Sequence, residues 1–152
     1  MLQFVPEVPM RKAWSILTIL VLVFAASPVW AVTVPLQRED VKRILKRLEE
    51  DTDHYSKSLD SALDKSPLNG SRAEDEINNY VHQFEEATDH LKDKYEDQGA
   101  APNLTREVLS RAQSIDRFMR RNSLGGQAES DWRIVRSDLN LLARSYRITW
   151  RW

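Results

Sequence analysis

Residues 37–65 read QREDVKRILKRLEEDTDHYSKSLDSALDK, and this stretch decides the fold class. Its apolar side chains recur at steps of three and four residues, and one threonine fills a turn. They are Val41, Ile44, Leu45, Leu48, Thr52, Tyr55, Leu59, Ala62 and Leu63. At about 100° per residue these positions fall within an arc of about 100°, so the stretch predicts an amphipathic helix with one apolar face.

The chain breaks after this stretch, at residues 66–70 (SPLNG), and then carries a helix-start signal. Ser71 followed by Glu74 has the capping-box pattern, in which a hydroxyl and a carboxylate satisfy free amide groups of a first turn. We therefore expect a second helix to begin near Arg72. Its apolar stripe comprises Ala73, Ile77, Tyr80, Val81, Phe84, Ala87, Leu91 and Tyr95.

Two further stripes follow. Residues 98–102 (QGAAP) form the next break, and Asn103 is the expected N-cap of a third helix, which residues 122–126 (NSLGG) end. Its inward side chains are expected to be Leu104, Val108, Ala112, Ile115, Phe118 and Met119. A fourth helix is expected from about Ala128 to near the C-terminus. Its apolar side carries Trp132, Val135, Leu139, Leu142, Ala143, Tyr146 and Trp150.

Four amphipathic helices joined by short breaks predict an all-α fold, an antiparallel up-down four-helix bundle. No sustained two-residue alternation occurs in residues 32–147, so β structure has no support. We expect residues 32–152 to form a single helical-bundle domain. The 152 residues contain no cysteine, which excludes disulfides, cysteine-ligated metal sites and thiol catalysis.

Residues 1–31 have the three parts of a signal peptide: two basic residues, an apolar run over residues 13–26 and a small residue at Ala31. We expect cleavage after Ala31 and therefore an exported protein, periplasmic or extracellular and bacterial rather than eukaryotic. A retained anchor is the alternative, although the run is shorter than the roughly 20 residues that span a bilayer. Met10 is an alternative start to Met1.

Charge is distributed unevenly along the exported part. Residues 32–103 hold 10 basic and 17 acidic side chains, whereas residues 104–152 hold 10 basic and 5 acidic ones. One interpretation is that acidic helices lie beside basic helices within the bundle. The other is contact with an anionic partner such as an acidic membrane surface, because five arginines of the fourth helix project within an arc of about 80°. These are Arg133, Arg136, Arg144, Arg147 and Arg151.

A second apolar line runs along the same predicted helix. Ile134, Leu141 and Ile148 are seven residues apart, about 150° from the centre of the main stripe, and Trp152 is nearby. Such a line predicts a coiled-coil-like partner surface, for a homodimer or an envelope protein. Coverage by the segment 32–36, or by a wider buried arc, is the alternative interpretation.

Residues that could carry chemistry are few. No nucleophile elbow or phosphate loop is present, so we expect no enzyme and no cofactor. His82, Glu86 and His90 follow at four-residue steps and could bind a divalent metal with help from Asp89, but a solvated polar face explains them better. The net charge of residues 32–152 is −2, which does not suit nucleic-acid binding.

Residues 132–146 read WRIVRSDLNLLARSY and resemble the C-terminal part of small exported bacterial helical proteins of unknown function. The resemblance implies bacterial export and no particular activity. Within it, we expect Asp138 to pair with a neighbouring arginine. The functional hypothesis is a non-enzymatic interaction or structural module of the cell envelope, and the alternative is a periplasmic carrier of a metal or another ligand.

Overall fold

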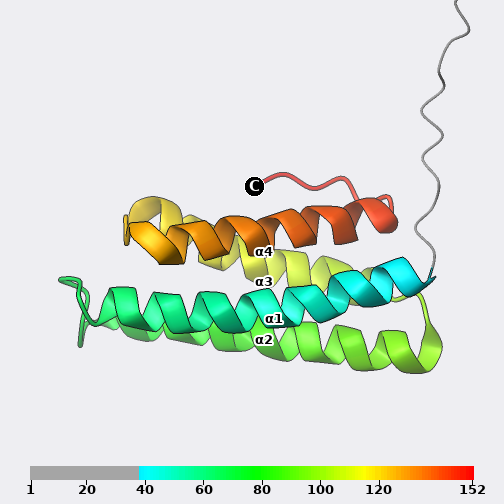
Figure 1. Cartoon of the computed structure of the whole chain (residues 1–152), viewed down its shortest axis with the longest axis horizontal. Coiled ribbons are helices and arrows are strands. Elements are labelled where there is room, and N and C mark those ends of the chain that lie inside the picture. Colours follow the sequence, from blue (N-terminus) through cyan, green and yellow to red (C-terminus); the bar gives the residue numbers. More distant parts are fainter. Residues whose placement is uncertain (1–37) are drawn as a thin grey trace, which may run out of the picture. The chain divides into compact units, whose positions relative to one another are not determined.

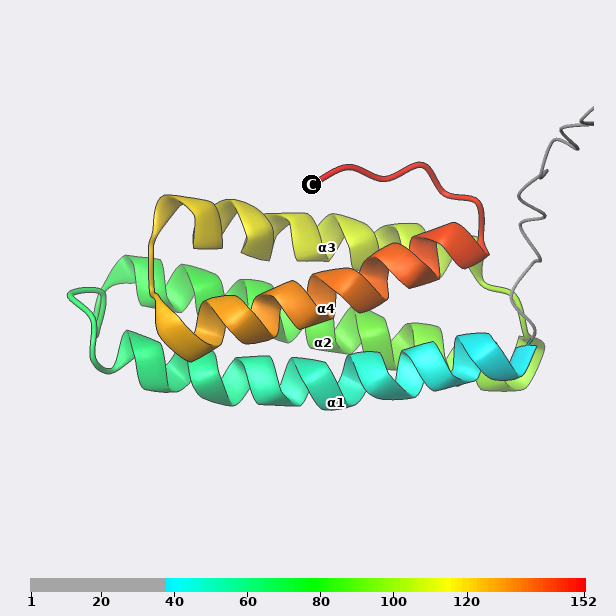
Figure 2. The same cartoon turned by 45° about the horizontal axis from the view of Figure 1, so that its top comes forward.

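The computed structural model describes residues 38–152, which form four α-helices and, over this range, no strand. The helices are α1 (Arg38–Leu63), α2 (Arg72–Gln98), α3 (Pro102–Arg121) and α4 (Gly126–Ser145). Successive helices run in opposite directions, and each packs against two others (Figures 1 and 2). This confirms the predicted all-α four-helix bundle. The expected signal peptide, with its alternatives of a retained anchor and a start at Met10, lies outside the described residues.

The closest helix pairs are α1 with α4 and α2 with α3. Each pair joins a helix of the acidic half of the chain to a helix of the basic half, as the charge distribution predicts. The pairing also brings α1 beside the helix farthest from it in sequence. No helix within residues 38–152 combines the length and apolar composition that crossing a bilayer requires.

The start of α2 confirms the capping signal. The Ser71 hydroxyl accepts hydrogen bonds from the backbone N–H groups of Ala73 and Glu74, at 3.2 and 3.4 Å. The Glu74 carboxylate in turn accepts from the backbone N–H of Gly70, at 2.5 Å. Two free donors of the first turn therefore have a partner, and so does the backbone N–H just before the cap.

The start of α3 differs from the prediction. Asn103 is not its N-cap: the helix begins at Pro102, and the cap residue is Ala101, which makes no side-chain cap hydrogen bond. Proline suits the first helical position because its φ is already helical and its missing N–H would have no intrahelical partner there. The N-cap therefore lies two residues earlier than the predicted asparagine cap.

The end of α4 also differs. The helix stops at Ser145, so Trp150 does not belong to it. Arg147 adopts φ +54°, and its backbone N–H donates to the Arg144 carbonyl at 3.0 Å, while that of Ile148 donates to the Ala143 carbonyl at 2.8 Å. These two bonds form a Schellman motif, with arginine in the left-handed position that glycine usually occupies. Residues 147–152, the C-terminal tail, then run back along the bundle (Figures 1 and 2).

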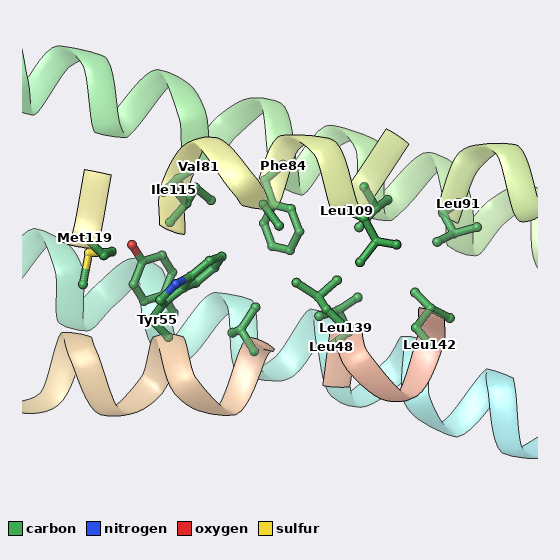
Figure 3. Packing of buried hydrophobic residues seen from close by; sticks show 14 of the residues in the cluster. Leu48, Tyr55, Val81, Phe84, Leu91, Leu109, Ile115, Met119, Leu139 and Leu142 are labelled. Carbon is green, nitrogen blue, oxygen red and sulfur yellow. The ribbon is translucent and has the colours of Figure 1, made fainter. Parts of the chain in front are cut away.

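The four apolar faces meet in one core. Figure 3 shows labelled side chains from every helix converging there, among them Leu48, Phe84, Ile115 and Leu139. Each of these four is fully buried, as the stripes predict. Burying apolar area at about 25 cal/mol per Å² is the main stabilising contribution to such a core.

Candidate functional site

A groove of about 540 Å³ lies where α1 and α4 pack together. Its lining consists of two arginines, two aspartates, two serines and one isoleucine. They are Arg47, Asp51, Ser130, Arg133, Ile134, Ser137 and Asp138. The groove thus combines both signs of charge with a single apolar side chain.

Asp138 forms the buried wall of this groove, with 5 % of the residue exposed. Its Oδ1 accepts a hydrogen bond from Arg47 at 2.6 Å, so the expected arginine partner exists but comes from α1, 91 residues away. Its Oδ2 accepts from no donor in residues 38–152, although it is buried. A buried acceptor without a partner costs roughly 1–3 kcal/mol, so this oxygen is a place where a donor from outside would be favoured.

Asp51 on α1 completes the polar part of the groove. Its carboxyl group lies within hydrogen-bonding reach of Asp138. Burial raises the pKa of Asp138 above its ordinary value of 3.8, and Asp51 raises this pKa further, while Arg47 opposes both effects. The carboxyl group of Asp138 therefore favours a proton or another hydrogen-bond donor at its free oxygen.

Ile134 is the apolar part of the groove. With 48 % of its surface exposed, it is the only large hydrophobic side chain that residues 38–152 leave exposed. Ser130 and Ser137 lie about one turn away on either side along α4. Their short side chains leave Ile134 accessible to a facing molecule.

The other members of the predicted partner surface lie elsewhere. Leu141 is partly buried and packs against the core, as do Ile148 and Trp152. Ile148 and Trp152 cannot continue a helical line, because α4 ends at Ser145. The predicted four-residue stripe is therefore wrong as a helix surface, and Ile134 is the member that remains exposed.

The five arginines predicted to contact an anion do not share one helix face. Only Arg133, Arg136 and Arg144 belong to α4, because Arg147 and Arg151 follow the end of the helix. Arg136 is occupied: its guanidinium lies 3.2 Å from an oxygen of Asp116 and over the Trp152 ring, 4.9 Å from the ring centre. The projection that placed five arginines on one arc is therefore wrong, and contact with an anion stays a prediction for the exposed ones.

Asp116 on α3 is a buried acceptor that the sequence analysis missed. Its Oδ1 accepts from the Trp132 indole N–H at 3.2 Å and lies beside Arg136, while its Oδ2 lies 2.8 Å from Arg120. Both oxygens of this buried carboxylate are thus satisfied. This network of a carboxylate with three donors fixes α3 and α4 relative to each other, which is a structural role.

The C-terminal tail is held by the same cluster. The Trp152 indole donates to Asn140 at 2.8 Å, and its ring meets that of Trp132 edge to face, with centres 6.3 Å apart. Gln113 on α3 donates to the Arg151 carbonyl at 3.4 Å. The tail therefore lies across α3 and α4. These contacts do not involve the residues that line the α1/α4 groove.

The side chains considered as metal ligands do not converge. His82 lies 3.4 Å from Glu86, and both are exposed on α2. Four carboxylates line a separate groove between α1 and α2, and Lys92 forms an ion pair with one of them, Glu49, at 2.5 Å. No group of three or more potential metal ligands within residues 38–152 has an arrangement that could hold a metal ion.

Sequence spacing contains a signal for the buried carboxylates of α4. Asp131 and Asp138 are seven residues apart and directly precede Trp132 and Leu139 of the apolar stripe, so they lie on its flank, towards α1.

Comparison with protein-family models, with curated proteins and with solved structures gave no match. The residues of the chain itself are therefore the basis for a functional hypothesis.

Proposed function

We propose that this chain is a non-enzymatic, exported interaction module of the cell envelope that binds a protein partner in the α1/α4 groove. One observation carries the proposal: the groove places the exposed Ile134 next to the buried, unpartnered Oδ2 of Asp138. An apolar anchor beside an unsatisfied acceptor is a combination that a partner's side chains can complete.

The physical argument concerns what a partner would relieve. Covering Ile134 removes apolar area from water, and a donor placed against Asp138 removes the cost of its free oxygen. Within residues 38–152 neither cost is removed, and both fall in this one groove. An enzyme would need reacting groups in an enclosed setting, whereas this groove is open and its carboxylate already engages Arg47.

The export part of the proposal rests on residues 1–31 alone. Intact-mass measurement of the protein recovered from its own cells tests it. We expect the mass of a chain that begins at Val32, and we expect to find this chain in the envelope or extracellular fraction. A chain that keeps residues 1–31 and stays in the cytoplasm would contradict export without affecting the groove.

A photo-crosslinking residue at position 134 tests the interaction. Cells that make the full chain are irradiated, and crosslinked products are identified by mass spectrometry. The matched control carries the same residue at position 79, which is exposed on α2, a helix that does not pack against α4. We expect a protein adduct from position 134 and not from position 79. Equal yields, or no adduct from position 134, would contradict the proposal.

A further inference from the structure

We infer that the partner in the α1/α4 groove is a second copy of this chain, bound about a two-fold axis near Ile134. This inference rests on the proposed function, because it names the partner of the same groove. In a two-fold interface each copy offers the same surface, so the surface must be complementary to itself. The groove meets this requirement in charge and in its place on α4.

The charges of the groove are self-complementary. Arg47 and Arg133 supply positive charge, and Asp51 and Asp138 supply negative charge, on one lining. A partner of one sign would meet like charges at half of these positions. A copy turned by 180° can instead bring its exposed Arg133 towards the two carboxyl groups, where the Oδ2 of Asp138 needs a donor.

The position of Ile134 suits a two-fold axis. It lies near the middle of α4, which runs from Gly126 to Ser145. An axis at this point places two copies of α4 antiparallel with overlap along most of their length. The short side chains of Ser130 and Ser137 on either side allow the helices to approach. Because such an interface uses one surface per copy, it closes at a dimer.

Sedimentation equilibrium of the chain as processed by its own cells tests the inference over a wide concentration range. We expect a reversible monomer–dimer equilibrium. Ile134→Asp should raise the dissociation constant at least about tenfold, since each dimer carries the change twice at its centre. Asn79→Asp adds the same charge on α2 and should leave the equilibrium unchanged.

Arg133→Glu is the second variant, which tests the charge argument at an exposed site and does not depend on Ile134. It should also raise the dissociation constant, because it sets carboxylates against carboxylates across the axis. Circular dichroism at the concentrations used shows that each variant keeps its helices. A wild-type dimer whose dissociation constant is the same in both variants would overturn the inference.

A monomer at every concentration would also overturn it, and the crosslinking experiment then separates the two proposals. If position 134 captures a different protein, the second copy is wrong and the proposed interaction stands. If position 134 captures nothing, both are wrong. A crosslinked product with the mass of two copies, together with the sedimentation result, supports both.

Discussion

Tyr55 places a hydroxyl group in the core, where residues 38–152 offer it no hydrogen-bond partner. The residue is fully buried, and burial raises the pKa of its phenol, which therefore stays neutral. Its ring contributes to packing, because it lies 5.0 Å from the ring of Trp132. The ring therefore stabilises the bundle, whereas the hydroxyl group does not.

Tyr55→Phe keeps the ring and removes the unpaired hydroxyl. We expect the free energy of unfolding to stay the same or to rise by up to about 1 kcal/mol, since an unsatisfied buried group is lost and no hydrogen bond is broken. Urea denaturation followed by circular dichroism measures the change. A loss of more than about 1 kcal/mol would show that the hydroxyl has a partner in solution.

Asp138 should make stability depend on pH. Its folded-state pKa lies above the ordinary value of 3.8, chiefly because of burial, so the folded chain holds this proton more tightly than the unfolded chain. This contribution to stability is therefore present at low pH, decreases as pH rises above about 3.8, and is gone above the folded-state pKa. The charged groups that face Asp138 from α1 are Arg47 and Asp51.

Asp138→Asn tests this assignment. The amide can accept from Arg47 as the carboxylate does and can donate to Asp51 at every pH, so it imitates the protonated acid. We expect the variant to gain stability relative to the wild type as pH rises from 4 to 7. Urea denaturation at several pH values gives the difference, and a difference that is constant with pH would be the contrary result.

The buried carboxylates mark the limit of sequence reasoning at this scale. Spacing alone shows Asp131 and Asp138 on the flank of an apolar stripe, but it does not show what faces them. Arg47, which donates to the Oδ1 of Asp138, is 91 residues away. Its pairing depends on which helices become neighbours, and single-helix periodicity contains no such information.

At the scale of elements, the C-terminal tail is held by side chains rather than by regular backbone hydrogen bonding. Trp152 contacts Trp132, Arg136 and Asn140 at once. Trp150 adds an edge-to-face contact with Trp152, with centres 5.8 Å apart. The tail should therefore detach when this one residue is truncated.

Trp152→Ala should lower the free energy of unfolding by about 1–3 kcal/mol, since it removes the ring packed against Trp132 and the aromatic partner of Arg136. Arg151→Ala is the matched control, because this neighbouring side chain is exposed and the tail contact it makes uses its backbone carbonyl. Chemical denaturation of both variants gives the comparison. Equal small effects would mean that the tail contributes nothing to stability.

Helix boundaries show why some element ends follow from sequence and others do not. The start of α2 is encoded locally by Ser71 and Glu74, and the structure confirms it. The end of α4 is not: an arginine, not a glycine, occupies the left-handed position at 147. The tail contacts that follow come from residues far along the chain, such as Gln113, so tertiary packing determines this end.

At the scale of the whole molecule, the bundle follows from its stripes and short breaks, whereas the site does not. Four apolar faces joined by short connections leave antiparallel packing as the direct solution, and the structure has it. Predicting the groove requires two further facts: α1 packs closely against α4, and α4 ends at Ser145. The first depends on tertiary packing, and the second separates Ile134 from Ile148 and Trp152 of its predicted stripe.

A single shared core predicts that the bundle unfolds as a unit. Leu139 is fully buried, and it packs in a cluster to which all four helices contribute. Leu139→Ala should lower the free energy of unfolding by about 2–5 kcal/mol, through lost apolar burial and the cavity left behind. Leu141→Ala makes the same change two residues along α4 at a partly buried position, so its loss should be smaller.

Two probes decide whether that loss is shared by every helix. Circular dichroism follows all four helices, and tryptophan fluorescence follows the environment that includes Trp132 in the core. Because removing one core contact weakens the face that each helix buries, both probes should shift to the same new urea midpoint in Leu139→Ala. If fluorescence changed at a lower urea concentration than helicity, α4 and the tail would be separating first, and the α1/α4 groove would be lost before the remaining helices unfold.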